Sequence, residues 1–89
     1  MSEKLLMHPD IEIRPSAFKH GYTEQDVRSA FSSYFFNKPI KGRDGIEVLL
    51  GFSSSGEILE LFFEVSDDRY IVFHMMKCRK QFLEQTRKR

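Results

Sequence analysis

Three apolar segments in the second half of the chain follow one another with only four residues between them. They span Ile46–Phe52, Glu57–Val65 and Tyr70–Met76, and the separators Ser53–Gly56 and Ser66–Arg69 are rich in turn-forming residues. Strands joined in this way cannot be parallel, because a parallel pair needs a crossover of about a dozen residues. The sequence therefore predicts an antiparallel three-stranded meander at the centre of the fold.

Four-residue connections also predict which side chains share a face of this sheet. With Phe52 opposite Glu57 and Val65 opposite Tyr70, one face is entirely apolar and is the predicted core. Its members are Ile46, Val48, Leu50, Leu59, Leu61, Phe63 and Val72. The second face would carry Glu47, Glu60, Glu64, Leu49, Ile58, Phe62, Ile71, Phe73 and Met75. It is more apolar than an exposed face usually is, so we expect the C-terminal helix or a partner to cover it.

The segment before the meander predicts a helix over residues 24–34. Thr23 is a good N-cap, and apolar residues recur at helical spacing after it. Further upstream, residues 11–14 fit a short edge strand that ends before a proline. Residues 16–21 fit one helical turn closed by a glycine.

Residues 34–44 predict a short strand, and the Asp44–Gly45 pair predicts a turn before the meander. A basic helix is expected from about Lys77. A chain of 89 residues has room for one core. We therefore expect a flexible tail over residues 1–10 and a single α+β domain over 11–89, with the N-terminal helices on one face of the antiparallel sheet.

The composition excludes several classes of protein. The chain is 40% hydrophobic and 30% charged, which is too apolar for intrinsic disorder and too charged for a membrane protein. Its single cysteine, Cys78, excludes a disulfide framework and a cysteine-based zinc cluster within one chain. We expect a cytoplasmic protein without membrane association, because no stretch approaches the ~20 apolar residues of a spanning helix.

The formal net charge of +1 hides an uneven distribution along the chain. Residues 47–68 contain six acidic side chains and no lysine or arginine, whereas residues 77–89 contain six basic side chains and one acidic one. Such blocks of opposite sign either pair with each other inside the molecule or form two surfaces for different partners.

No glycine-rich phosphate loop, zinc pattern or nucleophile elbow occurs in the sequence. Four short runs stand out instead: Lys19–Gly21, Thr23–Val27, Ala30–Phe31 and Val72–Arg79. Their order and spacing around the three strands resemble the BrnT-type toxins, which are small bacterial proteins of type II toxin–antitoxin systems with a RelE-like ribonuclease fold. The resemblance covers residues 11 to about 83.

The resemblance implies a metal-independent RNA endonuclease with no cofactor. Arg79 matches the family arginine after the last strand, and with Lys77 it would stabilise the negative charge of the cleaving phosphate. His74 and His20 would transfer protons, because histidine titrates near neutral pH. The basic residues expected to bind RNA are Lys77, Lys80, Arg87, Lys88 and Arg89. The expected partners are RNA, a cognate antitoxin protein and, for self-association, a second copy of the chain.

Each of these residues also has a structural interpretation. The predicted register puts His74 beside Leu61 on the core side, where a hydrogen-bonded histidine is as common as a catalytic one. His20 precedes a glycine at a helix end, and the basic C-terminal run complements a helix dipole. The alternative function is therefore a non-catalytic binding or oligomerising domain that retains the fold.

Overall fold

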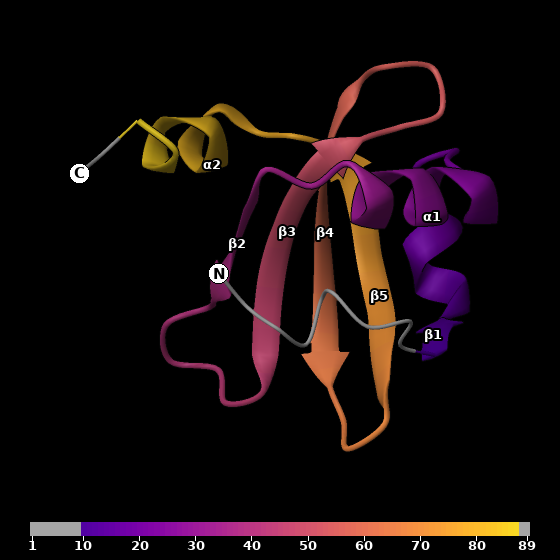
Figure 1. The fold of residues 1–89 in the computed structure, drawn as a ribbon, viewed down its shortest axis with the longest axis vertical. Helices are drawn as coiled ribbons and strands as arrows, with labels where there is room; N and C mark the ends of the chain where they lie inside the picture. Colours follow the sequence, from indigo (N-terminus) through magenta and orange to yellow (C-terminus); the bar gives the residue numbers. More distant parts are fainter. Residues whose placement is uncertain (1–9, 88–89) are drawn as a thin grey trace.

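The computed structural model describes residues 10–87 and shows a small α+β domain built on one mixed sheet (Figure 1). The elements are β1 (Asp10–Ile13), the 3-10 helix η2 (Pro15–Phe18), α1 (Glu24–Ser32), β2 (Phe36–Pro39), β3 (Ile46–Phe52), β4 (Ile58–Val65), β5 (Arg69–Lys77) and α2 (Lys80–Gln85). The sheet has the strand order β1-β5-β4-β3-β2. Its centre is the predicted meander, since β3, β4 and β5 are antiparallel neighbours.

The outer strands make the sheet mixed rather than purely antiparallel. The predicted edge strand is β1, but it lies parallel to β5, with Ile11 opposite Tyr70. A parallel arrangement is allowed here because η2, α1 and three other strands separate β1 from β5 along the chain. At the other edge β2 is antiparallel to β3.

The predicted register between β3 and β4 is wrong by one residue. Phe52 lies opposite Ile58 rather than Glu57, because the Ser53 hydroxyl accepts the Glu57 main-chain N–H at 3.0 Å and so holds Glu57 in the turn. A slip of one residue exchanges the two faces of a strand. The core side of β3 therefore carries Leu49, whereas the predicted core residues Ile46, Val48 and Leu50 lie on the second face.

A bulge in β5 changes the second half of the other pairing. Val65 lies opposite Tyr70 as predicted, but the register shifts by one residue at Phe73. Beyond the bulge His74 lies opposite Phe62 on the second face, and Met75 lies in the core. The predicted position of His74 beside Leu61 on the core side is therefore wrong. The alternation of side chains along the sequence does not show that a strand contains an extra, bulged residue.

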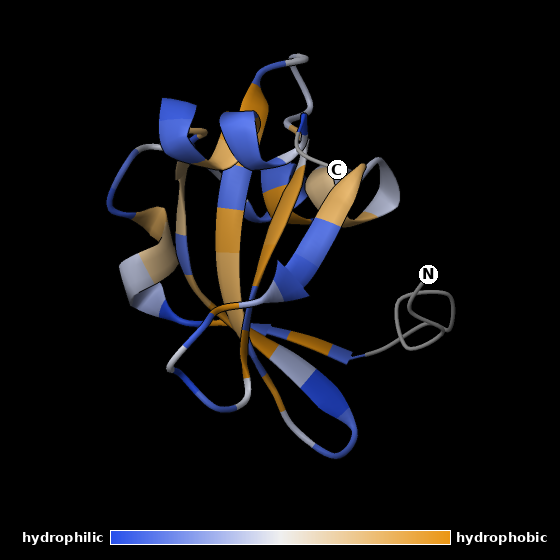
Figure 2. Ribbon diagram, turned by 90° about the vertical axis from the view of Figure 1, so that its left-hand side faces the viewer, coloured by the Kyte–Doolittle hydropathy of each residue, from blue (hydrophilic) through white to orange (hydrophobic). Residues whose placement is uncertain are grey.

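The core lies between α1 and one face of the sheet. Its buried members are Ala17, Val27, Ala30, Leu49, Leu59, Leu61, Phe63, Tyr70, Val72 and Met75. The helix begins at a capping box formed by Thr23 and Asp26 and ends at Ser32, two residues before the predicted end. It lies so close to β3 that a Cβ atom on Gly51 would be 2.2 Å from the Ala30 carbonyl oxygen. In Figure 2 the most hydrophobic colours lie on the strands.

The face of the sheet opposite α1, which we continue to call the second face, is partly covered by α2. This helix begins at Lys80, three residues later than predicted, and the Phe82 ring lies 5.7 Å from the Phe62 ring of β4. The C-terminal helix therefore provides part of the cover that this face was expected to need. Among residues 10–87 we find no helix of the length and apolarity that crossing a membrane requires.

Two predictions concern residues outside the described range. Residues 1–9 belong to the predicted flexible tail, which stays a prediction, while Asp10 is already part of β1. Lys88 and Arg89, two of the predicted RNA-binding residues, also lie outside residues 10–87.

Candidate functional site

A fully buried carboxylate lies at the middle of the second face. Glu60 of β4 has no exposed surface, and its neighbours Leu59 and Leu61 point into the core on the other side of the strand. An ionised carboxylate is stable in such a position only when it is paired and hydrogen-bonded. Glu60 therefore identifies a place where donors must converge.

Arg79 and His74 supply those donors. The Arg79 main-chain N–H donates to Glu60 Oε1 at 2.9 Å, and its side chain donates to Oε2 from Nε at 3.0 Å and from Nη2 at 2.6 Å. His74 Nε2 lies 3.0 Å from the same Oε2. We call these three residues, together with His20, the Glu60 cluster.

The hydrogen bonds determine the charge of Glu60. Burial alone would raise its pKa, but the hydrogen bonds from His74 and Arg79 outweigh burial and lower the pKa to about 2. An ionised carboxylate can only accept hydrogen bonds, so His74 Nε2 must carry the proton in this contact. In the neutral imidazole of His74 the free lone pair is then on Nδ1. This nitrogen is therefore the atom that can accept a proton.

Arg79 connects the cluster to solvent. Its side chain is 43% exposed, and its guanidinium lies 5.4 Å from the centre of the Phe82 ring. Arg79 is also the N-cap residue of α2, so its contacts with Glu60 hold the start of this helix against β4. Glu60 of the acidic segment 47–68 is thus paired with Arg79 of the basic segment 77–89 inside the molecule.

His20 reaches the cluster because of the segment after β1. Ser16 of η2 donates its hydroxyl to the carbonyl oxygen of Phe73, the bulged residue of β5, at 2.7 Å. The chain then continues to His20, whose ring lies edge-on to the His74 ring with 6.0 Å between centroids. The bulge and the 3-10 helix together bring two imidazoles side by side.

The structure brings together all three residues that the sequence suggested for catalysis: Arg79, His74 and His20. Sequence reasoning missed Glu60, which joins two of them. The available signal was a glutamate between two leucines in an apolar strand, since a charge at such a position demands a partner.

The predicted RNA-binding residues Lys77, Lys80 and Arg87 are less closely associated with the cluster. Lys77 lies opposite Leu59, which places it on the core side of the sheet at the end of β5. Lys80 is the exposed first residue of α2, and Arg87 is exposed just after that helix. Within residues 10–87, the hydrogen bonds to Glu60 come from Arg79 and His74 and not from these three.

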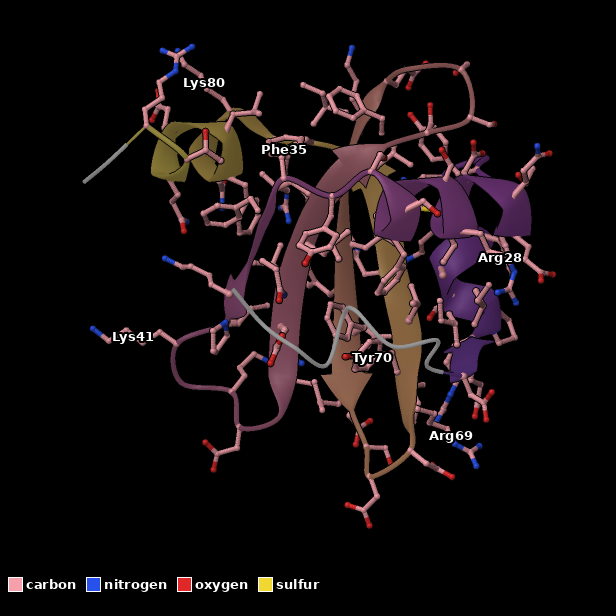
Figure 3. The ribbon with its side chains drawn as sticks, in the orientation of Figure 1. Arg28, Phe35, Lys41, Arg69, Tyr70 and Lys80 are labelled. Carbon is pink, nitrogen blue, oxygen red and sulfur yellow. The ribbon has the colours of Figure 1, made fainter. Side chains whose placement is uncertain are left out.

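Three other groups with acid–base or nucleophilic chemistry are poorly placed for it. Tyr70 is buried in the core on the α1 side of the sheet (Figure 3), and burial raises its pKa. Tyr22 donates to Glu57 at 2.5 Å, and this bond raises its pKa to about 12. Burial and the nearby Glu60 raise the pKa of the Cys78 thiol to about 11, so the thiolate needed for nucleophilic attack is scarce at neutral pH.

No family model, curated protein or solved structure matches this chain. Among residues 10–87, no three histidine, cysteine, aspartate or glutamate side chains are grouped as ligands of a metal ion would be.

Proposed function

We propose that this protein is a metal-independent RNA endonuclease that acts as the toxin of a type II toxin–antitoxin system, as its resemblance to the BrnT-type toxins implies. The observation that carries the proposal is that His74 and Arg79 both bond to Glu60, and that the His20 ring lies beside the ring of His74. These residues come from three separate segments of the chain. RNA cleavage without a metal needs a base, an acid and a cation for the developing phosphate charge, and two imidazoles with a guanidinium can supply all three.

In the proposed reaction His74 is the general base. Glu60 holds its Nε2–H, so Nδ1 can take the proton of a ribose 2′-hydroxyl. The 2′-oxygen then forms a bond to phosphorus while the bond from phosphorus to the 5′-oxygen of the next nucleotide breaks. His20 in its protonated form supplies the proton that this leaving oxygen needs. The products are a 2′,3′-cyclic phosphate and a free 5′-hydroxyl.

Arg79 is the proposed electrostatic stabiliser of that step. A guanidinium offers several N–H donors in one plane, so part of it can remain on Glu60 while the exposed edge contacts a phosphate oxygen. Glu60 neutralises much of the positive charge of Arg79 in the free protein. What Arg79 offers the pentacoordinate phosphate is therefore chiefly the N–H donors on its exposed edge.

A non-catalytic binding domain is the second candidate, and one observation favours it. The pairing of Arg79 with the fully buried Glu60 also holds α2 on the sheet, which is a purely structural role. Under this interpretation His74 is a hydrogen-bonded structural residue and His20 contributes nothing beyond packing.

Induced expression in bacteria distinguishes the two candidates. We expect the parent to slow growth and to degrade bulk RNA, and we expect His20→Ala to lose both effects. His20 is exposed, so its removal should leave the fold intact. Lys19→Ala is the matched control, because it removes the neighbouring exposed basic residue and should remain toxic. A parent protein that neither slows growth nor degrades RNA would favour the binding domain.

A further inference from the structure

A row of aromatic rings crosses the second face of the sheet from α2 to the bulge of β5. Phe82 packs edge-on against Phe62 with 5.7 Å between ring centres, and Phe62 packs edge-on against Phe73 at 6.3 Å. All three side chains are half-buried, in contrast to the buried members of the core on the other side. Each ring therefore keeps part of its surface open to solvent.

The bulge is the reason that two consecutive residues lie beside Phe62. In a regular strand Phe73 and His74 would point to opposite faces. Here the ring of His74 lies 4.6 Å from that of Phe62, and Phe73 also contacts it. The aromatic row therefore runs directly beside the Glu60 cluster.

An arginine lies at each end of the row. Arg79 is over the ring of Phe82 at 5.4 Å, and Arg43, which is exposed in the connection between β2 and β3, is over the ring of Phe73 at 5.8 Å. One exposed acid, Glu64, shares this face of β4. Glu60 and Arg79 neutralise each other, so the positive charge of the row comes from its Arg43 end.

Two lysines extend this positive surface beyond Phe82. A groove of about 350 Å³ lies between β2 and α2, and its lining includes Lys38, Lys41, Val48, Phe82 and Gln85. Lys41 projects from the same connection that carries Arg43 (Figure 3). The groove thus continues the second face with a lining that is partly apolar and partly cationic.

Aromatic rings flanked by cations suit single-stranded nucleic acid. Every base has a flat face that can stack on an exposed ring, and the cations hold the phosphates between the bases. Double-stranded nucleic acid does not offer its base faces in this way. A protein partner would need acidic side chains opposite Arg43, Lys38 and Lys41, whereas one nucleic-acid strand supplies both flat bases and anionic phosphates.

We propose that the aromatic row is a binding site for single-stranded RNA, in which a base stacks on Phe73 and Arg43 holds an adjacent phosphate. This site extends the proposed function. Only that function makes the bound strand a substrate, and in this respect the site rests on it. A strand bound along the row passes His74, so the phosphate next to the stacked base reaches the Glu60 cluster. Arg43 and Phe73 then position the RNA without taking part in the proton transfers.

Binding of a short 2′-O-methylated RNA oligonucleotide tests this site without cleavage, because the blocked 2′-oxygen cannot attack the phosphate. Fluorescence anisotropy of the labelled oligonucleotide is measured over a range of salt concentrations. We expect Phe73→Leu to weaken binding about tenfold. Arg43→Ala should weaken it about fivefold and lower the slope of log affinity against log salt by about one, while Arg43→Lys should keep that slope.

Two matched controls lie outside the row. Arg28 is exposed on α1, on the other side of the sheet, and Phe35 belongs to a separate exposed ring pair with Phe52 (Figure 3). Arg28→Ala and Phe35→Leu should leave binding within about twofold of the parent. Thermal unfolding of each variant shows whether the protein is folded at the assay temperature.

Three results would overturn the site: no binding by the parent, unchanged binding by folded Phe73→Leu and Arg43→Ala, or equal losses in the controls. The first or second is expected if the face serves a protein partner instead. Binding that depends on Phe73 and Arg43 supports the site even if unmodified RNA is never cleaved. In that case the proposed nuclease function fails while the binding site stands.

Discussion

Arg79 Nη2 lies 2.6 Å from Glu60 Oε2, and this ion pair joins the start of α2 to the middle of β4. The carboxylate of Glu60 is fully buried, and the side chain of Arg79 is 43% exposed. The pair therefore has two roles that can be measured separately. It holds α2 on the second face, and it keeps a cation beside His74.

Removing the arginine alone should destabilise the protein, because it leaves a buried carboxylate short of partners. We expect Arg79→Met to lower the free energy of unfolding by about 2 to 3 kcal/mol. Adding Glu60→Gln should recover at least half of that loss, since the orphaned charge is gone. Urea denaturation of both single variants and the double variant gives the coupling. Simple additivity of the two single losses would show that the pair contributes little to stability.

Acid should weaken the parent more than the Glu60→Gln variant. The pKa of Glu60 falls from its usual 4.5 to about 2 on folding. Between these values the unfolded chain binds the proton and the folded chain does not. Stability from this group is therefore complete above pH 4.5 and is lost as the pH falls toward 2. Urea midpoints at pH 5 and pH 3 measure the effect, and equal drops in both proteins would contradict the assigned ionisation of Glu60.

Gly51→Ala should be strongly destabilising, because its methyl group would meet the Ala30 carbonyl oxygen of α1 at 2.2 Å. Helix and strand would have to separate, at a cost of about 2 kcal/mol or more. The matched control is Gly56→Ala, which has open space around it and costs only backbone strain at φ 95°, about 1 kcal/mol. Thermal denaturation compares the two. Equal losses would mean that α1 does not lie against β3 as described.

Two local hydrogen bonds, one in the turn at Ser53 and one at the bulge of β5, produced features that the sequence did not predict. The meander was predictable because three apolar segments are separated by short polar turns. Its register was not, because the hydroxyl of Ser53 extends the first turn by one residue and so reverses the faces of β3. The bulge at Phe73 was equally hidden, since its carbonyl finds a partner in Ser16, 57 residues away.

The candidate site was predictable in its parts but not in its assembly. Arg79 and His20 were identified from the resemblance, and His74 was assigned to the wrong face. The residue that joins Arg79 and His74, Glu60, could be placed only after the register was known. Arg43 was missed because its position follows from the fold of the β2–β3 connection and not from any local pattern.

Cleavage of a short RNA by the purified chain in the presence of EDTA is the most direct test of metal-independent catalysis by the Glu60 cluster. We expect products with 2′,3′-cyclic phosphate and 5′-hydroxyl ends, and no cleavage when the 2′-hydroxyl is absent. We expect His20→Ala to cleave at least about 100-fold more slowly, while Lys19→Ala cleaves like the parent. Cleavage that stops in EDTA, or that proceeds equally in His20→Ala, would contradict the assignment of acid–base catalysis to the Glu60 cluster.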